Sequence, residues 1–207
     1  YVVGSTFGIF PGQSGSGVGT DAFIRKYDPT GAETWTRQFG PAVSLQVQGD
    51  FAMAIDVSAD SSGNVYLVGR VGGAFEGFDN DFTGMEDGFI RKYDGSGNEI
   101  WTRQFGPQGQ GTATTGLVLD PAGNQYVVGS TNGALPGQTY AGQGDAFVIK
   151  YDSAGDLAWT RQFGTVEHDR NSAVALDTDG SIYVVGETNG TLPSQVSAGG
   201  TDGYLRK

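Results

Sequence analysis

The chain of 207 residues has no cysteine, one histidine and no long apolar run. Without cysteine, disulfide bonds, thiolate metal sites and thiol catalysis are excluded. A membrane-spanning helix needs about 18 apolar residues, and the longest uninterrupted apolar runs are short pieces such as residues 52–55. We therefore expect no membrane insertion.

Basic residues are also scarce. The chain has 12 Lys and Arg against 23 Asp and Glu, a net charge of -11. Ten of the 12 lie in two repeated strand segments, which leaves only Arg70 and Arg170 for the loops. A nucleic-acid interface needs a basic patch to neutralise phosphates, so we expect no nucleic-acid binding.

Glycine, in contrast, is abundant, with 36 residues. It interrupts almost every window of ten residues, and each glycine inside a helix costs about 1 kcal/mol relative to alanine. We therefore expect almost no helix. The chain opens with Tyr1-Val2-Val3-Gly4 and no Met, so we expect it to start inside a structural element and to be part of a longer protein.

Internal repetition is the strongest pattern in the chain. The string WTRQFG starts identically at Trp35, Trp101 and Trp159. A second string, DAFIRKYD or a close variant, starts at four positions (Asp21, Asp87, Asp145 and Asp202), and a third, YVVG or YLVG, starts at another four (Tyr1, Tyr66, Tyr126 and Tyr183). The repeat period is 57 to 66 residues.

Each repeat contains four short segments rich in β-branched and aromatic residues, which predicts four strands. In the second repeat we expect strands at 53–57, 65–69, 88–93 and 100–105. Two connections per repeat have the form Asp-x-x-Gly and predict tight hairpins. These begin at six aspartates: Asp28, Asp60, Asp94, Asp120, Asp152 and Asp177.

Four antiparallel strands repeated at this period predict an all-β fold, a β-propeller of four-stranded antiparallel blades, with a solenoid less favoured. The 14 expected strands make about three and a half blades. We expect one partial propeller over residues 1–207, divided into a blade part at 1–40, blades at 41–106 and 107–164, and a blade part at 165–207. Closure then requires either further blades in a longer chain or self-association of two chains into a seven-bladed ring.

Several motifs together resemble a known family: GSTNGALPGQ from Gly129, DAFVIKYD from Asp145, the strand at Trp159 and Asp-x-x-Gly-Asn at Asp120. They look like the bacterial seven-bladed β-propeller repeat known as SBBP. The resemblance covers the chain from end to end. It implies a propeller fold in a secreted or surface-attached protein and supplies no catalytic residues. The second repeat departs from it, because residues 71–86 replace the T-x-G-x-L-P-G-Q loop with an acidic loop that lacks proline.

Binding residues are expected in the longer loops opposite the Asp-x-x-Gly hairpins, because loops on a rigid scaffold carry most binding sites. The repeated Trp-x-Arg-x-Phe pattern places three side chains on one strand face. We interpret these residues as structural: the aromatic rings fill the space between blades, while Arg pairs with turn carboxylates or stacks on rings. The alternative is a carbohydrate or ligand platform of exposed Trp.

An acidic loop is the best metal candidate. Asp79 and Asp81, with Glu86 and Asp87 nearby, place oxygen ligands at close spacing in an irregular segment, and calcium takes 6 to 8 oxygens. We expect no cofactor other than this candidate calcium site, for which a solvated acidic loop is the alternative. The six Asp-x-x-Gly turns each offer only one or two carboxylates and are interpreted as structural.

His168, the only histidine, stands in Glu167-His168-Asp169-Arg170. Such a group can perform acid-base work, but no second histidine, no G-x-S-x-G elbow and no phosphate loop accompanies it. We therefore expect a non-enzymatic module, extracellular or on the cell surface, that serves as a structural or protein-interaction scaffold. The partner would be a protein or a surface polymer. The alternatives are a module that binds calcium, glycan or peptide through the long-loop face, and a hydrolase or lyase with its site at the channel mouth.

Overall fold

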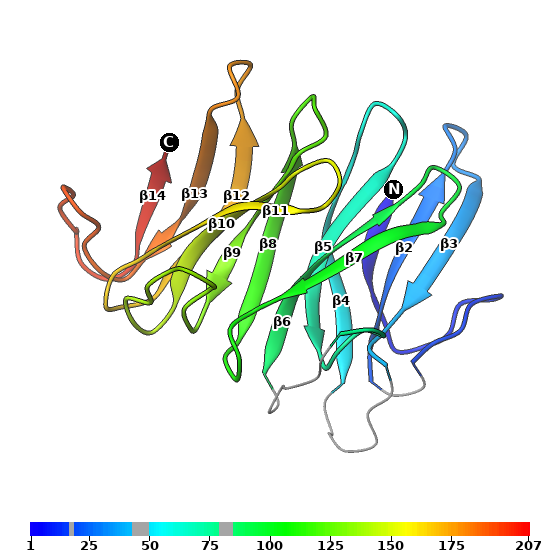
Figure 1. Ribbon diagram of the computed structural model, residues 1–207, viewed down its shortest axis with the longest axis horizontal. Helices are drawn as coiled ribbons and strands as arrows, with labels where there is room; N and C mark the ends of the chain where they lie inside the picture. Colours follow the sequence, from blue (N-terminus) through cyan, green and yellow to red (C-terminus); the bar gives the residue numbers. More distant parts are fainter. Residues whose placement is uncertain (17–18, 43–49, 79–84) are drawn as a thin grey trace.

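The computed structural model describes residues 1–16, 19–42, 50–78 and 85–207. It contains 14 strands in four antiparallel sheets, which stand side by side in chain order (Figure 1). The described residues contain no helix, and hence none that is long and apolar enough to cross a membrane. The expected all-β propeller-type fold is confirmed.

The first two sheets consist of consecutive strands. Their bounds are β1 (Val2–Thr6), β2 (Asp21–Tyr27) and β3 (Glu33–Phe39), followed by β4 (Phe51–Ala59), β5 (Val65–Gly72), β6 (Glu86–Tyr93) and β7 (Glu99–Phe105). The last two sheets repeat this arrangement. Their bounds are β8 (Thr112–Leu119), β9 (Gln125–Thr131), β10 (Asp145–Tyr151) and β11 (Leu157–Phe163), followed by β12 (Asp169–Leu176), β13 (Ile182–Thr188) and β14 (Asp202–Arg206).

The two middle sheets have four strands and the two outer sheets have three. Their strands correspond in sequence, so that β4, β8 and β12 are the inner strands and β3, β7 and β11 are the outer strands. Inner strands of neighbouring sheets contact one another. The first sheet therefore has no inner strand among the described residues, and the last sheet has no outer strand.

In the three sheets that have an inner strand, a glycine in the second strand allows this inner strand to approach closely. Gly69 and Gly129 each pair with the inner strand at a β-bulge. A Cβ atom on either glycine would overlap a carbonyl oxygen of that strand, belonging to Met53 and Ala113 respectively. This contact explains the glycine that ends the last three YVVG-like strings, since Gly186 meets the Arg170 carbonyl in the same way.

Three apolar clusters fill the three junctions between sheets. Alternate residues of one strand serve different junctions: Leu67 packs toward the first sheet and Val68 toward the third. This is the period of two expected of a strand that is buried on both faces. The third cluster has three buried members, Val128, Val148 and Val184.

Candidate functional site

Connections of two kinds lie at opposite ends of the sheets, as Figure 1 shows. The six Asp-x-x-Gly segments lie at one end and the longer loops, such as 132–144 and 189–201, at the other. The expected separation into a hairpin face and a long-loop face is therefore present.

The hairpins are built as predicted. In each, the glycine amide donates to the carbonyl of the aspartate three residues earlier, and the six glycines have φ between 78° and 86°. The Asp94 carboxylate accepts the amides of Asn98 and Ser96, both at 2.8 Å. The bond from the Asn98 amide is the main cause that lowers the pKa of Asp94. These carboxylates are occupied by their own turns.

A glutamine on the outer strand ties the long loop to the third strand. In β11, the Gln162 Oε1 accepts the amide of Leu135 at 2.9 Å. Its Nε2 donates to the Asp145 carboxylate at 2.8 Å and to the Gly133 carbonyl at 3.2 Å. Asp145 has no exposed surface, so the amide group supplies a hydrogen bond to one oxygen, Oδ2, of a buried carboxylate. We call this set of three bonds the glutamine latch.

The same latch is present in the first two sheets. Gln38 and Gln104 each bind a third-strand aspartate, a loop carbonyl and a loop amide, the partners being Asp21, Gly8 and Phe10 for Gln38 and Asp87, Gly73 and Phe75 for Gln104. The second loop lacks the L-P-G-Q motif, yet Gly73 and Phe75 take the positions of Gly133 and Leu135. The latch needs a main-chain carbonyl and amide at these positions, and side-chain identity matters less there.

Apolar side chains are exposed on the connections beyond the latch. Among the described residues, five are large and partly or fully solvated, with exposed fractions of 90% for Phe7, 63% for Ile9, 46% for Met85, 71% for Val166 and 95% for Val196. The loop with the first two is anchored, because the Phe10 amide donates to the Gln38 side chain at 2.9 Å. The Phe10 ring packs edge-on against Phe23 at 5.2 Å. Phe7 and Ile9 are therefore solvated on an anchored loop.

Only two of the four residues of the predicted calcium site are among the described residues. Asp79 and Asp81 lie outside the described residues. Glu86 forms an ion pair with Arg70 at 3.1 Å, and Asp87 accepts a bond from Gln104 at 3.1 Å. In the part of the chain that the structure describes, no three His, Asp or Glu side chains are grouped to hold a metal ion. The calcium site remains a prediction.

The residues around His168 do not converge. Asp169 is buried and accepts the Thr165 hydroxyl at 2.9 Å, while Arg170 forms an ion pair with Glu187 at 2.8 Å. His168 is exposed. Arg70 and Arg170, which we expected in loops, lie in β5 and β12; this expectation was wrong, because both strands extend further toward the long-loop face.

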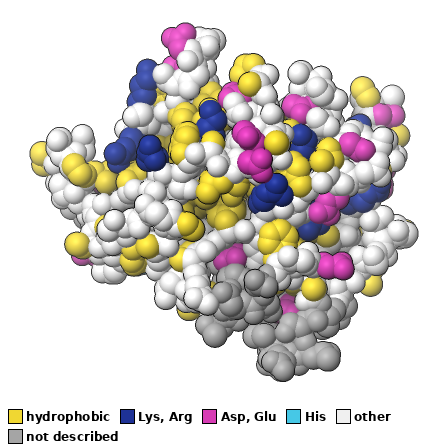
Figure 2. All heavy atoms as spheres, in the orientation of Figure 1, with side chains coloured by type: hydrophobic (Ala, Val, Ile, Leu, Met, Phe, Trp, Pro, Cys, Tyr) yellow, Lys and Arg dark blue, Asp and Glu magenta, His cyan; other side chains and the backbone are white. Residues whose placement is uncertain are grey.

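The Trp-x-Arg-x-Phe residues make the junctions between sheets. The Trp35 Nε1 donates to the Gly95 carbonyl at 3.2 Å, and the Arg37 Nε to the Gly97 carbonyl. Both acceptors belong to the β6–β7 hairpin of the next sheet. Arginine therefore binds turn carbonyls more than the turn carboxylates we expected; the Arg103–Asp156 pair at 3.7 Å is a carboxylate contact. Figure 2 shows basic and acidic side chains next to one another on the face that it views.

A comparison with family models identifies two segments. The SBBP model, described as a β-propeller repeat, matches residues 100–136 and 158–193. Each segment covers most of an outer strand, then the inner and second strands of the next sheet, and ends in the long loop. The matched repeat therefore crosses a junction between sheets.

Two known proteins are similar to the chain. "Regulatory protein FlaEY" of Caulobacter vibrioides is 28% identical over 181 residues, which cover 80% of this chain and 19% of that protein. The chain thus spans about a fifth of this curated relative. A crystal structure of a protein of unknown function from Bacteroides caccae is 13% identical with a TM-score of 0.34, over 80% of this chain and 61% of that one.

Proposed function

We propose that this chain, which is built from β-propeller repeats of the SBBP family, is a non-enzymatic scaffold that binds a protein partner through its long-loop face. It acts outside the cell or on the cell surface, a location that the SBBP resemblance in the sequence supports. The sheets and latches form a common frame, and the loop tips supply the contacts that differ from one repeat to the next.

The observation that carries this proposal is the exposed pair Phe7 and Ile9 on a loop anchored by Gln38. Large apolar side chains that stay solvated in a folded domain mark interaction sites when they are grouped. Held on a fixed backbone, they lose little conformational freedom on binding. Aromatic residues are also common among the side chains that dominate interface energy.

Two further findings support binding rather than catalysis. The acid-base residues around His168 point to separate partners, so the described residues bring together no general acid and base there. The relative from Caulobacter vibrioides is named a regulatory protein, and regulation through a propeller repeat is consistent with partner binding.

A site-specific photo-cross-linker tests the proposal in the cells that produce the protein. We expect a cross-linker at position 7 to capture one defined partner protein. Cross-linkers at Ile100 and Leu157, which are 50% and 57% exposed at the hairpin end of the outer strands, should capture none. The control positions match position 7 in apolar character and differ in face.

The captured partner then allows a quantitative test. Replacing Phe7 and Ile9 by serine should weaken its binding by about tenfold or more, which corresponds to about 1.4 kcal/mol. The Ile100→Ser variant should bind within twofold of the unchanged chain. Equal capture from both faces, or equal affinity of both variants, would contradict a long-loop binding face.

A further inference from the structure

A cavity of about 400 Å³ lies where the long loop of the second sheet meets β6 and β7. The loop supplies two aromatic rings and a carboxylate to its lining, and the strands supply a guanidinium, a second carboxylate and a hydroxyl group. These side chains are Phe75, Glu76 and Phe78 from the loop and Arg91, Glu99 and Thr102 from the strands. The cavity therefore combines hydrogen-bond donors, acceptors and apolar surface.

Arg91 is the buried polar group of this cavity. The residue is 6% exposed, and its guanidinium packs over the rings of Phe39 and Phe75, at 4.0 and 4.6 Å from the ring centres. Its Nη1 lies 3.3 Å from the Glu99 carboxylate. Its Nε is buried and has no hydrogen-bond partner among the described residues. A buried donor without an acceptor is costly, so an acceptor on a ligand is favoured at this position.

The corresponding positions of the neighbouring sheets differ. In the first sheet the Arg25 Nε donates to the Thr36 hydroxyl at 2.8 Å, so this donor is satisfied within its own sheet. In the second sheet the counterpart hydroxyl, that of Thr102, does not accept from the Arg91 Nε. In the third sheet Ile149 stands at the position of Arg91. A buried arginine with an unpaired donor is thus a feature of the second sheet.

The loop residues of the cavity also distinguish the second sheet. The other three long loops have proline at the position of Glu76 and glutamine at the position of Phe78. These residues are Pro11, Pro136 and Pro193, and Gln13, Gln138 and Gln195. The second loop keeps the same turn, because the Phe78 amide donates to the Phe75 carbonyl at 3.1 Å. The carboxylate and the ring are therefore presented on the backbone that the other loops use.

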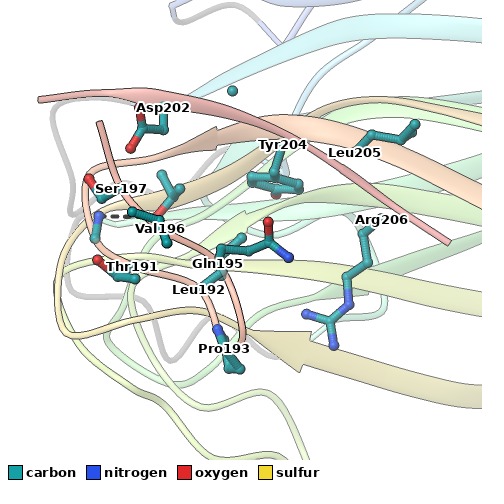
Figure 3. A pocket seen from close by; sticks show the side chains of 13 residues that line it. Thr191, Leu192, Pro193, Gln195, Val196, Ser197, Asp202, Tyr204, Leu205 and Arg206 are labelled. Atoms are coloured by element: carbon teal, nitrogen blue, oxygen red, sulfur yellow. Dashed lines mark hydrogen bonds between the residues drawn. The ribbon is translucent and has the colours of Figure 1, made fainter. Parts of the chain in front are cut away.

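Glutamine has a structural role at this position in the other loops. The Gln13 side chain accepts the Gln38 amide of the outer strand at 3.2 Å, and Gln138 accepts the corresponding amide in the third sheet at 3.1 Å. Figure 3 shows the loop of the last sheet, with Pro193 and Gln195 on the loop and Arg206, the counterpart of Arg91, on the strand beside it. Phenylalanine cannot make the glutamine bond, and in the second sheet it lines the cavity instead.

The charges of the cavity favour a neutral ligand. An anion drawn to Arg91 would be repelled by Glu76 and Glu99 and by the net charge of -11, whereas a cation drawn to the two carboxylates would leave the Arg91 Nε without an acceptor. A hydroxyl group both donates and accepts, so a neutral ring with several hydroxyl groups can bond all three side chains. The cavity volume lies in the range of small-ligand sites, about 300–1,000 Å³.

We propose that this cavity binds one neutral sugar ring. The Arg91 Nε donates to a sugar oxygen, the carboxylates of Glu76 and Glu99 accept sugar hydroxyl groups, and the Phe78 ring packs against the C–H face of the sugar. The site uses neither Phe7 nor Ile9, and it does not depend on the protein-binding surface proposed above.

The test is a titration of the whole chain, labelled with ¹⁵N, with the methyl glycosides of glucose, galactose and mannose. We expect at least one of them to bind saturably in the millimolar range and to shift the Arg91 Nε–H signal together with the amide signals of residues 74–78. Acetate and methylammonium ions serve as charged comparisons and should bind more weakly than this glycoside. No saturable binding of any glycoside, or tighter binding of either ion, would overturn the proposal.

Two substitutions give the second loop the residues of the other loops, which keeps the fold of the loop. Glu76→Pro and Phe78→Gln should each weaken the bound glycoside by about tenfold. Pro136→Glu is the matched control, because it adds a carboxylate at the same position of the third sheet, where Ile149 replaces the arginine; affinity and stoichiometry should not change. Circular dichroism confirms that the variants fold. Unchanged affinity in Glu76→Pro or in Phe78→Gln would contradict binding in this cavity.

Discussion

The third sheet has an outer strand, β11, and the fourth has none among the described residues. Comparing the two shows which features of a sheet depend on the outer strand and which do not. With β11 in place, the loop after β9 is latched by Gln162. Without a corresponding strand, the loop after β13 still makes the same turn: the Gln195 amide donates to the Leu192 carbonyl at 3.0 Å, and the Gln138 amide to the Leu135 carbonyl at 2.9 Å. The turn of this loop therefore does not depend on the latch.

The third and fourth sheets differ more in the burial of their side chains than in the shape of their loops. Leu205 is 68% exposed in β14, whereas Val148 at the same position of β10 is 7% exposed. A cavity of about 220 Å³ also opens between the two sheets, against Trp159 and Phe163. At the earlier junction the ring of Tyr151 packs against Phe105 at 6.3 Å. Among the described residues, the last sheet thus keeps its strand pairing with three strands, while side chains such as Leu205 stay exposed.

The largest effect should come from removing the latch in the complete sheet. In Gln162→Leu the volume is nearly kept, but the buried Asp145 carboxylate loses a donor and the Leu135 amide loses its acceptor. Leaving such groups unsatisfied costs about 1–3 kcal/mol, so we expect about 2 kcal/mol less stability in urea unfolding.

The matched control is Gln195→Leu in the last sheet, where the side chain is exposed and stands in a loop that no outer strand covers. Its effect should stay within about 0.5 kcal/mol, as for ordinary surface changes. If both changes were equally destabilising, the latch would have no special role.

The latch itself was not predicted from the sequence, although the strands and turns were. Repetition and a period of two were enough to predict 14 strands, and the six Asp-x-x-Gly segments were enough to predict the hairpins, because these are local preferences. Gln162 shares a strand face with Thr160, opposite the Trp-x-Arg-x-Phe side chains, and so looks solvent-facing in the pattern of two. Its partners Asp145 and Leu135 are distant in the sequence, and pairing over such distances depends on packing. The identical glutamine in three WTRQFG strings was the available clue.

The other predictions that were wrong concern arginines, and they also depended on contacts that the sequence does not show. Arg70 and Arg170 were assigned to loops because strand ends are poorly marked in sequence. Both lie in paired strands and form ion pairs with Glu86 and Glu187 of the adjacent strands. The arginines Arg37 and Arg103 of the outer strands bind main-chain carbonyls of the next sheet. Because every residue has such a carbonyl, the residue types do not indicate which one accepts. The pattern therefore indicated which residues make the junction but not which atoms accept.

A second comparison concerns one position of the long loop. Gly137 has φ of 72°, and Ser194 occupies the same position of the last sheet with φ of 64°. A side chain in this left-handed region costs about 1 kcal/mol, a penalty that glycine avoids. We expect Ser194→Gly to raise the free energy of unfolding by about 0.5–1 kcal/mol and Gly137→Ser to lower it by about 1 kcal/mol.

Thermal unfolding of the two variants measures these opposite signs in one assay. Gly137→Ala is a useful third variant, because it keeps the backbone penalty without adding a hydroxyl group. If Ser194→Gly lowered the stability, the serine side chain would have to make a favourable contact in the last sheet that outweighs its backbone conformation.

The smallest expected difference in stability is between two arginines, one that bonds the next sheet and one that bonds only its own strand. The Arg103 Nε donates to the Gly155 carbonyl of the next sheet at 2.9 Å, with the guanidinium stacked over Trp101 at 5.2 Å. Arg161 keeps the stacking, over Trp159 at 5.7 Å, and its guanidinium donates to the Thr160 carbonyl of its own strand at 2.9 Å.

Alanine at each position therefore separates the contact between sheets from the stacking that both arginines share. Arg103→Ala should cost about 1 kcal/mol, the size of a net hydrogen bond to a charged donor on a partly exposed surface, and Arg161→Ala about half of that or less. Urea unfolding of the two variants under one buffer gives the difference. Equal losses would mean that the arginines act within their own strand, so that the junctions would rest on the aromatic contacts alone.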